Sequence, residues 1–243
     1  MQPDIIASNH DVVKASTSGS SVLPSNKRDY NDSLFEHVPW FYVFCRERLF
    51  RDDTERIIAA LWQNGGPPSG TELIELGCGP GFYSRRLAQR FPSLSVVGVD
   101  RSENQLDRAR RRAAARELGN CVFERVNVLE LPCPEARFDV LVASRLFTVL
   151  PERDQAVAEM YRVLRSGGRC FIAEPRNAVW ASIPLFAMWL LASVTHSGNG
   201  YREPLKATVL SDDAFEDLFR QQPWKQIQTW RDGRYQYALC EKG

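Results

Sequence analysis

Apolar residues fall into short continuous runs along the chain, and stretches with helical periodicity separate these runs. The runs have the length and composition of buried strands. They lie at 73–76, 94–100, 121–127, 138–144, 170–174, 224–230 and 234–240. Helical patterns lie at 52–61, 82–90, 102–118 and 152–164, and another starts at Ser211. The alternation of strand and helix predicts an α/β fold with a mostly parallel sheet and helices on both faces.

Local signals mark several element ends. Ser102 is predicted to cap a helix, with Gln105 three residues later as its capping-box partner. Asp52 or Asp53 is expected to cap the helix that precedes the first strand. Asp232-Gly233 lies between the last two apolar runs and predicts a β-hairpin there.

A glycine-rich turn, Glu75-Leu-Gly-Cys-Gly-Pro-Gly81, joins the first strand to a helix. This order forms nucleotide sites in parallel α/β proteins, because glycines let the backbone approach a ligand. A tight turn without a ligand remains an alternative, since the spacing is shorter than the dinucleotide fingerprint and no P-loop lysine is present. The next strand ends in Asp100, where a ribose would present its hydroxyls.

The glycine turn followed by Val97-Gly-Val-Asp100 resembles motif I and the acidic second-strand end of class I S-adenosylmethionine-dependent methyltransferases. The resemblance covers residues 71–175 and is weaker toward the C-terminus. It implies a Rossmann-like, seven-stranded, mostly parallel sheet whose last strand is antiparallel. It also implies S-adenosyl-L-methionine as cofactor and S-adenosyl-L-homocysteine as product.

The resemblance also assigns candidate cofactor residues. The turn residues Glu75, Gly77, Cys78, Gly79 and Gly81 would surround the amino-acid and ribose portions, and Cys78 is small enough to fit there. The remaining candidates follow strands: Asp100 for the ribose hydroxyls, Arg101 for stacking on the adenine, Asn127 and Val128 for the adenine edge, and Ser144 beside the transferring methyl.

Two of these positions depart from the family pattern. Asn127 stands where an acid commonly accepts from the adenine amino group, although its side-chain oxygen can still accept. Arg101 stands where an apolar residue more often flanks the adenine. The segment after Ser144 has neither the histidine typical of ubiquinone-methylating members nor the signature of adenine-amino methylation.

Composition narrows the partners. A net charge of +1 provides no basic field for nucleic acid, and 44% hydrophobic residues allow a sizeable core. The arginines between 108 and 116 are interpreted as a solvated helix face. The six cysteines form no C-x-x-C pair. This pattern is typical of reduced thiols, and it predicts no metal site. Without a signal-peptide pattern, we expect a cytoplasmic protein.

The chain divides into three regions. Residues 1–28 are expected to form a flexible tail, residues 29–66 an aromatic cap with a helix, and residues 67–243 the cofactor-binding core. The cap is interpreted either as a plug over the sheet edge or as one wall of a substrate pocket. His37 is the candidate base, and Tyr42 and Tyr30 are alternative hydrogen-bond donors.

An insertion at 176–204 contains the uncharged, strongly apolar segment 178–194. The segment is at or just below spanning length and contains Pro184, so a transmembrane helix is not expected. Three interpretations stay open: a lid over an apolar pocket, a membrane-surface contact, or a dimer face.

Together these features predict methyl transfer to an O, N or C atom of an apolar or aromatic small molecule. One alternative is methylation of a membrane-borne lipid or prenylated ring. The other is a module that binds S-adenosylmethionine without catalysis, since the sequence encodes no obvious base. The oligomeric state does not follow from the sequence.

Overall fold

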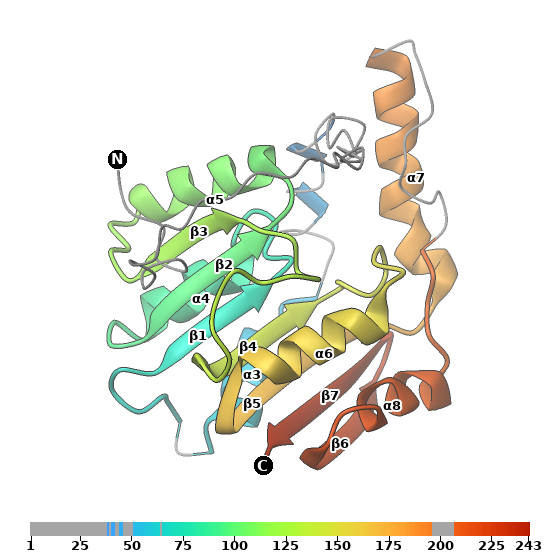
Figure 1. Cartoon of the computed structure of the whole chain (residues 1–243). Helices are drawn as coiled ribbons and strands as arrows, with labels where there is room; N and C mark the ends of the chain where they lie inside the picture. The colour runs from blue at the N-terminus through green and yellow to red at the C-terminus, as the bar shows by residue number, and fades with distance from the viewer. Residues whose placement is uncertain (1–37, 39, 42–43, 46–50, 64, 196–206) are drawn as a thin grey trace, which may run out of the picture.

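The computed structural model describes residues 38, 40–41, 44–45, 51–63, 65–195 and 207–243 (Figure 1). The expected tail at 1–28, and the candidates His37, Tyr42 and Tyr30, lie outside these residues. Residues 196–204 of the predicted insertion also lie outside them.

One seven-stranded sheet, in the order β3-β2-β1-β4-β5-β7-β6, forms the centre of the described structure. Only β7 runs antiparallel to its two neighbours, which confirms the predicted mostly parallel sheet. The strands are β1 (Glu72–Leu76), β2 (Ser95–Asp100), β3 (Cys121–Arg125), β4 (Phe138–Ser144), β5 (Leu164–Pro175), β6 (Trp224–Asp232) and β7 (Tyr235–Lys242). The strand order reverses at β1, and ligands of such sheets bind at that point, beyond the carboxyl ends of the strands.

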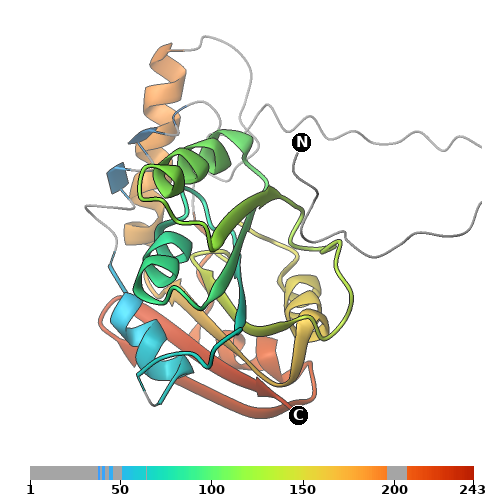
Figure 2. The same ribbon diagram turned by 90° about the vertical axis from the view of Figure 1, so that its left-hand side faces the viewer.

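Helices cover both faces of the sheet and make three layers (Figure 2). Helices α3 (Thr54–Leu61), α4 (Phe82–Arg90) and α5 (Glu103–Ala114) pack on one face. Helices α6 (Arg153–Val163) and α8 (Asp212–Arg220) pack on the other. Each face of the parallel strands is therefore buried, as their near-continuous apolar sequence requires.

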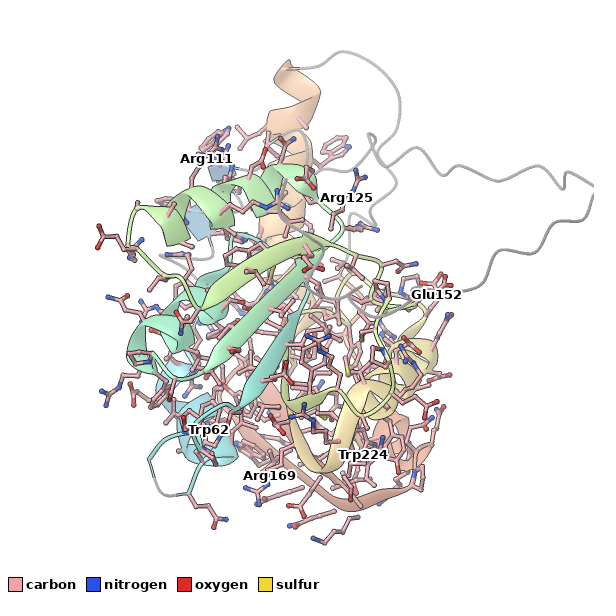
Figure 3. All side chains as sticks on the ribbon, turned by 60° about the vertical axis from the view of Figure 1, so that its left-hand side comes forward. Trp62, Arg111, Arg125, Glu152, Arg169 and Trp224 are labelled. Atoms are coloured by element: carbon pink, nitrogen blue, oxygen red, sulfur yellow. The ribbon has the colours of Figure 1, made fainter. Side chains whose placement is uncertain are left out.

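Helix α7 (Ala178–Thr195) differs from the others because it projects beyond the sheet (Figures 1 and 2). Figure 3 shows Arg125, the last residue of β3, at the end of the sheet nearer α7, and Trp224, the first residue of β6, at the opposite end. The carboxyl ends of the parallel strands therefore face the same side as α7.

Several predicted element ends need correction. The helix after Ser102 ends at Ala114 rather than at Leu118, because the chain turns through Glu117 with a φ of 55°. Residues 165–169, which separate the predicted helix at 152–164 from the predicted strand at 170–174, belong instead to β5, where the pairing with β4 shifts register. Tight turns and bulges share glycine-rich sequences, so composition alone does not separate them.

The caps agree better with expectation. Ser102 Oγ accepts from Gln105 N at 3.3 Å, as predicted, but no reciprocal bond from the Gln105 side chain is present. Asp52 Oδ1 accepts from Thr54 N at 3.0 Å, so Asp52 rather than Asp53 caps α3 with its side chain.

The buried carboxylate of Asp53 joins two distant parts of the chain. The Tyr237 hydroxyl of β7 donates to Asp53 Oδ1 at 3.0 Å, and Nε of both Arg51 and Arg56 lies 3.3 Å from the same oxygen. Both arginines also pair with Asp232 at the end of β6. A buried charge requires such partners, so this junction fixes α3 against the last two strands.

Candidate functional site

The glycine turn between β1 and α4 has the backbone geometry that its sequence predicts. Gly77, Gly79 and Gly81 have φ values of 65°, 52° and 67°, a region that residues with a Cβ rarely adopt. Gly79 N donates to Asp100 Oδ2 at 2.8 Å, and Ser102 N donates to Asp100 Oδ1 at 2.9 Å. The turn and the end of β2 are therefore held together by Asp100.

Burial raises the pKa of Asp100 above its usual value, and the hydrogen bonds from Ser102 and Gly79 oppose this rise. Asp100 thus lies at the strand end predicted for a ribose, with its orientation already set by backbone donors. Carboxylates oriented in this way are ready to accept further hydrogen bonds from hydroxyls.

Glu75 is buried and faces α4. Its Oε2 accepts from Ser84 N at 2.7 Å and also from the Ser84 hydroxyl. A carboxylate beside the first turn of a helix satisfies its free N–H groups and interacts favourably with the helix dipole. Glu75 therefore orders the helix that begins at the glycine turn.

Two glycines of the turn, Gly81 and Gly77, have close neighbours. A Cβ on Gly81 would lie 2.6 Å from the Phe123 ring and 3.0 Å from Ala109 Cβ. A Cβ on Gly77 would lie 3.0 Å from Leu146 Cδ1, which belongs to the segment after β4. Packing therefore requires glycine at Gly81, and the contact at Gly77 brings the ends of β1 and β4 together.

Cys78 is buried in this turn. Burial raises the pKa of its thiol well above the usual value, and the nearby charges of Asp100 and Glu75 raise it further. The thiolate is the reactive form of cysteine, so this environment disfavours Cys78 as a nucleophile and favours the interpretation of a small packing residue.

Two strands away from β1 in the sheet, Glu174 at the end of β5 orders the segment that follows β4. Its Oε1 accepts from Phe147 N at 2.9 Å, and its Oε2 accepts from Thr148 Oγ1 at 3.0 Å. Arg153 Nε and Nη2 donate to Phe147 O at 3.0 and 2.9 Å. Burial raises the pKa of Glu174 to about 7.

The predicted residue Ser144 ends β4 within this region. The next residue, Arg145, has a φ of 59°, and its N–H donates to Ala173 O at 2.8 Å. Arg145 Nη1 donates to the Tyr235 hydroxyl of β7 at 3.1 Å. A non-glycine residue in this conformation is strained, and these two hydrogen bonds hold it there.

The candidate adenine residues lie after β2 and β3. Asn127 Oδ1 accepts from Leu129 N at 3.1 Å in an exposed turn, and Val128 is buried. The Arg101 side chain is exposed, and its carbonyl accepts from Arg125 Nε at 3.1 Å. These contacts place Asn127, Val128 and Arg101 at neighbouring strand ends.

For Gln105, the sequence predicts only a capping role. Gln105 is 1% exposed in the first turn of α5, and neither polar atom of its side chain has a hydrogen-bond partner within the described part of the chain. An orphaned buried amide is costly unless a ligand or water satisfies it. Gln105 therefore joins the candidate ligand-binding residues, because it lies five positions after Asp100.

The described residues of the aromatic cap lie beside these strand ends. Val38 and Phe41 pack with Met188 and Ala192 of α7. Cys45 is buried, and the nearby positive charge of Arg145 partly opposes the rise that burial causes in its pKa. The cap therefore contacts both α7 and the segment after β4.

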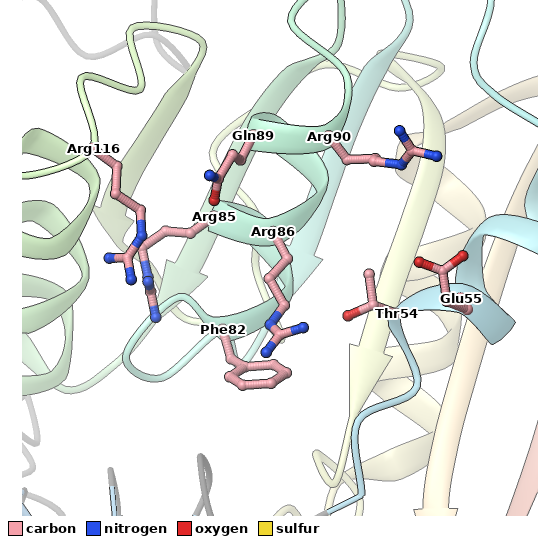
Figure 4. Close-up of a pocket in the computed structure, with 8 residues that line it drawn as sticks. All are labelled: Thr54, Glu55, Phe82, Arg85, Arg86, Gln89, Arg90 and Arg116. Atoms are coloured by element: carbon pink, nitrogen blue, oxygen red, sulfur yellow. The ribbon is translucent and has the colours of Figure 1, made fainter.

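A separate groove of about 630 Å³ lies on the outer side of α4 (Figure 4). Its lining is Thr54, Glu55, Phe82, Arg85, Arg86, Gln89, Arg90 and Arg116. None of the candidate cofactor residues lines it. We place the cofactor at the strand ends instead, since the glycine turn, the ribose acid and the sheet's switch point coincide there.

The described residues contain no group of three or more histidine, cysteine, aspartate or glutamate side chains placed to hold a metal ion. All six cysteines are buried and free. In this part of the chain, no helix combines the length and apolarity needed to cross a bilayer.

Comparison with known proteins relates this geometry to a family. A family model described as a methyltransferase domain matches residues 67–231. The chain is 35% identical over 106 residues to a demethylmenaquinone methyltransferase of Deinococcus radiodurans, which covers 44% of each protein. It is 36% identical over 107 residues to the 27-O-demethylrifamycin SV methyltransferase of Amycolatopsis mediterranei, covering 44% of this chain and 39% of the relative. The chain thus spans less than half the length of these curated relatives.

Solved structures show the same fold at low identity. The PH0226 protein of Pyrococcus horikoshii superposes with a TM-score of 0.61 at 20% identity, covering 84% of this chain and 99% of that one. A phosphoethanolamine N-methyltransferase of Haemonchus contortus in complex with S-adenosyl-L-methionine gives 0.58 at 14% identity, covering 77% and 52%. With the domain match spanning most of the sequence, the chain belongs to the class I S-adenosylmethionine-dependent methyltransferases.

Proposed function

We propose that this protein transfers a methyl group from S-adenosylmethionine to an O, N or C atom of an apolar or aromatic small molecule. One observation carries the proposal: the turn in which Gly79 N donates to Asp100 lies beside the ordered segment after β4, since a Cβ on Gly77 would lie 3.0 Å from Leu146. This arrangement lies at the switch point of a sheet whose family uses that cofactor.

On the cofactor side, Gly77 and Gly79 would admit the amino-acid and ribose portions, and Asp100 would accept from the ribose hydroxyls. Gln105, Arg101, Asn127 and Val128 would contact the adenine, with Gln105 supplying both a donor and an acceptor. The orphaned amide of Gln105 and the left-handed glycine turn fit such a ligand.

Bound there, S-adenosylmethionine supplies an electrophilic methyl for an in-line displacement. The residues of this chain need mainly to orient the acceptor, since orientation alone contributes about 7–11 kcal/mol to such reactions. The Glu174 and Arg153 bonds to the segment after Ser144 hold one wall of that position rigid. His37, Tyr42 and Tyr30 remain the proposed proton acceptor and hydrogen-bond donors.

The names of the relatives support a small-molecule acceptor. They include demethylmenaquinone, 27-O-demethylrifamycin SV and trans-aconitate as named substrates. The apolar surroundings favour an apolar acceptor, since Met188 of α7 packs with the cap and Leu185 packs beside Val149 of the segment after β4.

A transfer assay tests the proposal. The full chain is incubated with methyl-labelled S-adenosylmethionine and extracts fractionated by polarity, and we expect label in an apolar, low-mass fraction. Cofactor binding without label in any fraction would instead indicate a non-catalytic binding module.

The acid–base assignment has its own test. His37→Ala should lower kcat with cofactor affinity unchanged, and His10→Ala serves as the matched control in the tail. Unchanged kcat in His37→Ala would remove His37 from the site and leave the tyrosines.

A further inference from the structure

The outer face of α7 is apolar and exposed along its length. Val179, Ile183, Phe186 and Leu190 are 70%, 48%, 53% and 51% exposed. Their spacing of four, three and four residues places them on one side of a helix. The other side is packed, since Ala181, Leu185, Met188 and Ala192 are buried among other segments.

Trp180, at 52% exposure, adds to this surface at the base of α7. We call this surface the apolar ridge, formed by Val179, Trp180, Ile183, Phe186 and Leu190. On the packed side of the helix, Phe41 of the cap packs against Met188 and Ala192, and its neighbours Trp40 and Phe44 are 55% and 50% exposed. Exposed apolar surface of this kind marks protein or membrane contacts.

Its polar content favours a membrane over another protein. Residues 178–195 contain no charged side chain, and the Ser182 hydroxyl is already bonded to Ala178 O and Ala207 N. A protein–protein interface carries about ten direct hydrogen bonds, whereas the ridge side chains offer only one indole N–H group. Tryptophan, with an apolar body and one polar edge, suits the boundary between lipid and water.

Arginines lie at the base of the ridge. The Arg234 guanidinium is 4.0 Å from the centre of the Trp180 ring. Arg176 and Arg231 both contact the single carboxylate of Asp212 at 3.1 Å. These contacts leave more positive than negative charge beside the apolar residues, which complements anionic lipid headgroups.

The position and length of α7 agree with a helix that lies on a membrane surface. The helix projects past the strand ends (Figures 1 and 2). The stripe from Val179 to Leu190 is about 16 Å long, since a helix rises about 1.5 Å per residue. That length suffices to lie among headgroups and falls short of the hydrocarbon core, about 30 Å thick.

We propose that the apolar ridge is the surface by which this protein docks on an anionic lipid bilayer. Helix α7 lies in the plane of the interface, with Phe186 and Ile183 in the acyl boundary and Arg176 and Arg234 at the headgroups. The strand ends face the same side as α7, so an apolar acceptor enters from the bilayer; this last point rests on the proposed function.

The test is co-sedimentation of the full chain with vesicles of phosphatidylcholine alone and with 30% phosphatidylglycerol. We expect stronger binding to the anionic vesicles, weakened by added salt. The double variant Ile183→Asp/Phe186→Asp should reduce the partition coefficient at least about tenfold, because two apolar anchors are lost. Gln226→Asp, an exposed position near the start of β6, is the matched control and should bind as the wild type does.

Circular dichroism and the thermal midpoint verify that each variant is folded, and Val179→Asp replaces the double variant should that one unfold. The proposal is overturned by absent wild-type binding or by equal binding of wild type and folded variant. It is also overturned when light scattering shows a dimer that the variant dissociates, since the ridge would then join two copies. Vesicle binding requires no methyl transfer, so failure of the proposed function leaves this result intact.

Discussion

The two halves of the candidate site lie on either side of β1 and are held together by different kinds of contact. The cofactor half uses backbone groups close in sequence: Gly79 N bonds Asp100, and Ser84 N bonds Glu75. The acceptor half uses side chains that come from distant elements, such as Arg145 with Tyr235, which are 90 residues apart.

This difference separates what the family shares from what distinguishes this chain. A cofactor that presents the same groups in every member can be held by a fixed turn of backbone. An acceptor that varies requires walls that vary, and we propose that here these are α7, the cap and the segment after β4. We therefore expect substitutions in the first half to change the affinity for the cofactor. Substitutions in the second half should change the structural order of its segments and the access of the acceptor.

The largest effect is expected at Gly79. Gly79→Arg should abolish cofactor binding in titration calorimetry, a loss of more than about 1,000-fold or 4 kcal/mol, because the side chain occupies the ligand's place. The control Gly70→Arg also has a positive φ, of 79°, but meets no atom within 4 Å. Unchanged affinity in Gly79→Arg would place the ligand away from this turn.

A substitution at Gly81 should lower the free energy of unfolding rather than the affinity for the cofactor. Gly81→Ala forces a Cβ against the Phe123 ring at a φ of 67°, which should cost about 3 kcal/mol in urea unfolding. The control Gly65→Ala, with a φ of 82° and open surroundings, carries only the backbone strain, about 1 kcal/mol. Equal losses of unfolding free energy in the two variants would show that the Phe123 ring moves aside at no cost.

Glu174 should make the acceptor half sensitive to pH. Burial raises its pKa in the folded protein to about 7, from an ordinary value of 4.5. Between these values the folded state binds more protons, so this contribution to the unfolding free energy falls as pH rises. It amounts to at most about 3 kcal/mol.

The variant Glu174→Gln should therefore lose this part of the pH dependence. Urea midpoints of wild type and variant are compared from pH 4.5 to 8, so that other carboxylates cancel in the difference. The variant should gain relative stability up to about pH 7 and no more beyond it. A constant difference across the range would contradict the raised pKa.

The smallest effect is expected at Asp100. Asp100→Ala should weaken S-adenosylmethionine binding about 10- to 100-fold, because hydrogen bonds to a charged group contribute about 1.5–3 kcal/mol. Asp107→Ala, an exposed acid on α5 paired with Arg110, is the control. Unchanged binding in Asp100→Ala would mean that the sugar is held elsewhere.

The sequence predicted the local structure of the cofactor half well because its signals are local. The glycine turn, the strand that ends at Asp100 and the cap at Ser102 each follow from neighbouring residues, and the structure contains all three. That these residues bind the cofactor stays a prediction. Strand Phe138–Ser144 and helix Phe82–Arg90 have the predicted ends. The orphaned amide of Gln105 was missed because its residue also fits a capping box, and only burial distinguishes the two.

The acceptor half could not be predicted in the same way. Glu174 ends a strand like many other acids, and its bonds to Phe147 and Thr148 depend on the pairing of β5 beside β4. The exposed side of α7 likewise depends on which of its apolar residues find neighbours. Such features arise from tertiary packing, for which a single sequence has no local signal.

The Asp53 junction has a consequence for the order of folding. Asp53 and its hydroxyl partner, Tyr237, lie 184 positions apart in the sequence. Until β7 has joined the sheet, this carboxylate lacks that hydrogen bond, and burying it is unfavourable. We therefore expect α3 to dock only after β7 has paired, so that the first helix of the core is among the last parts to become ordered.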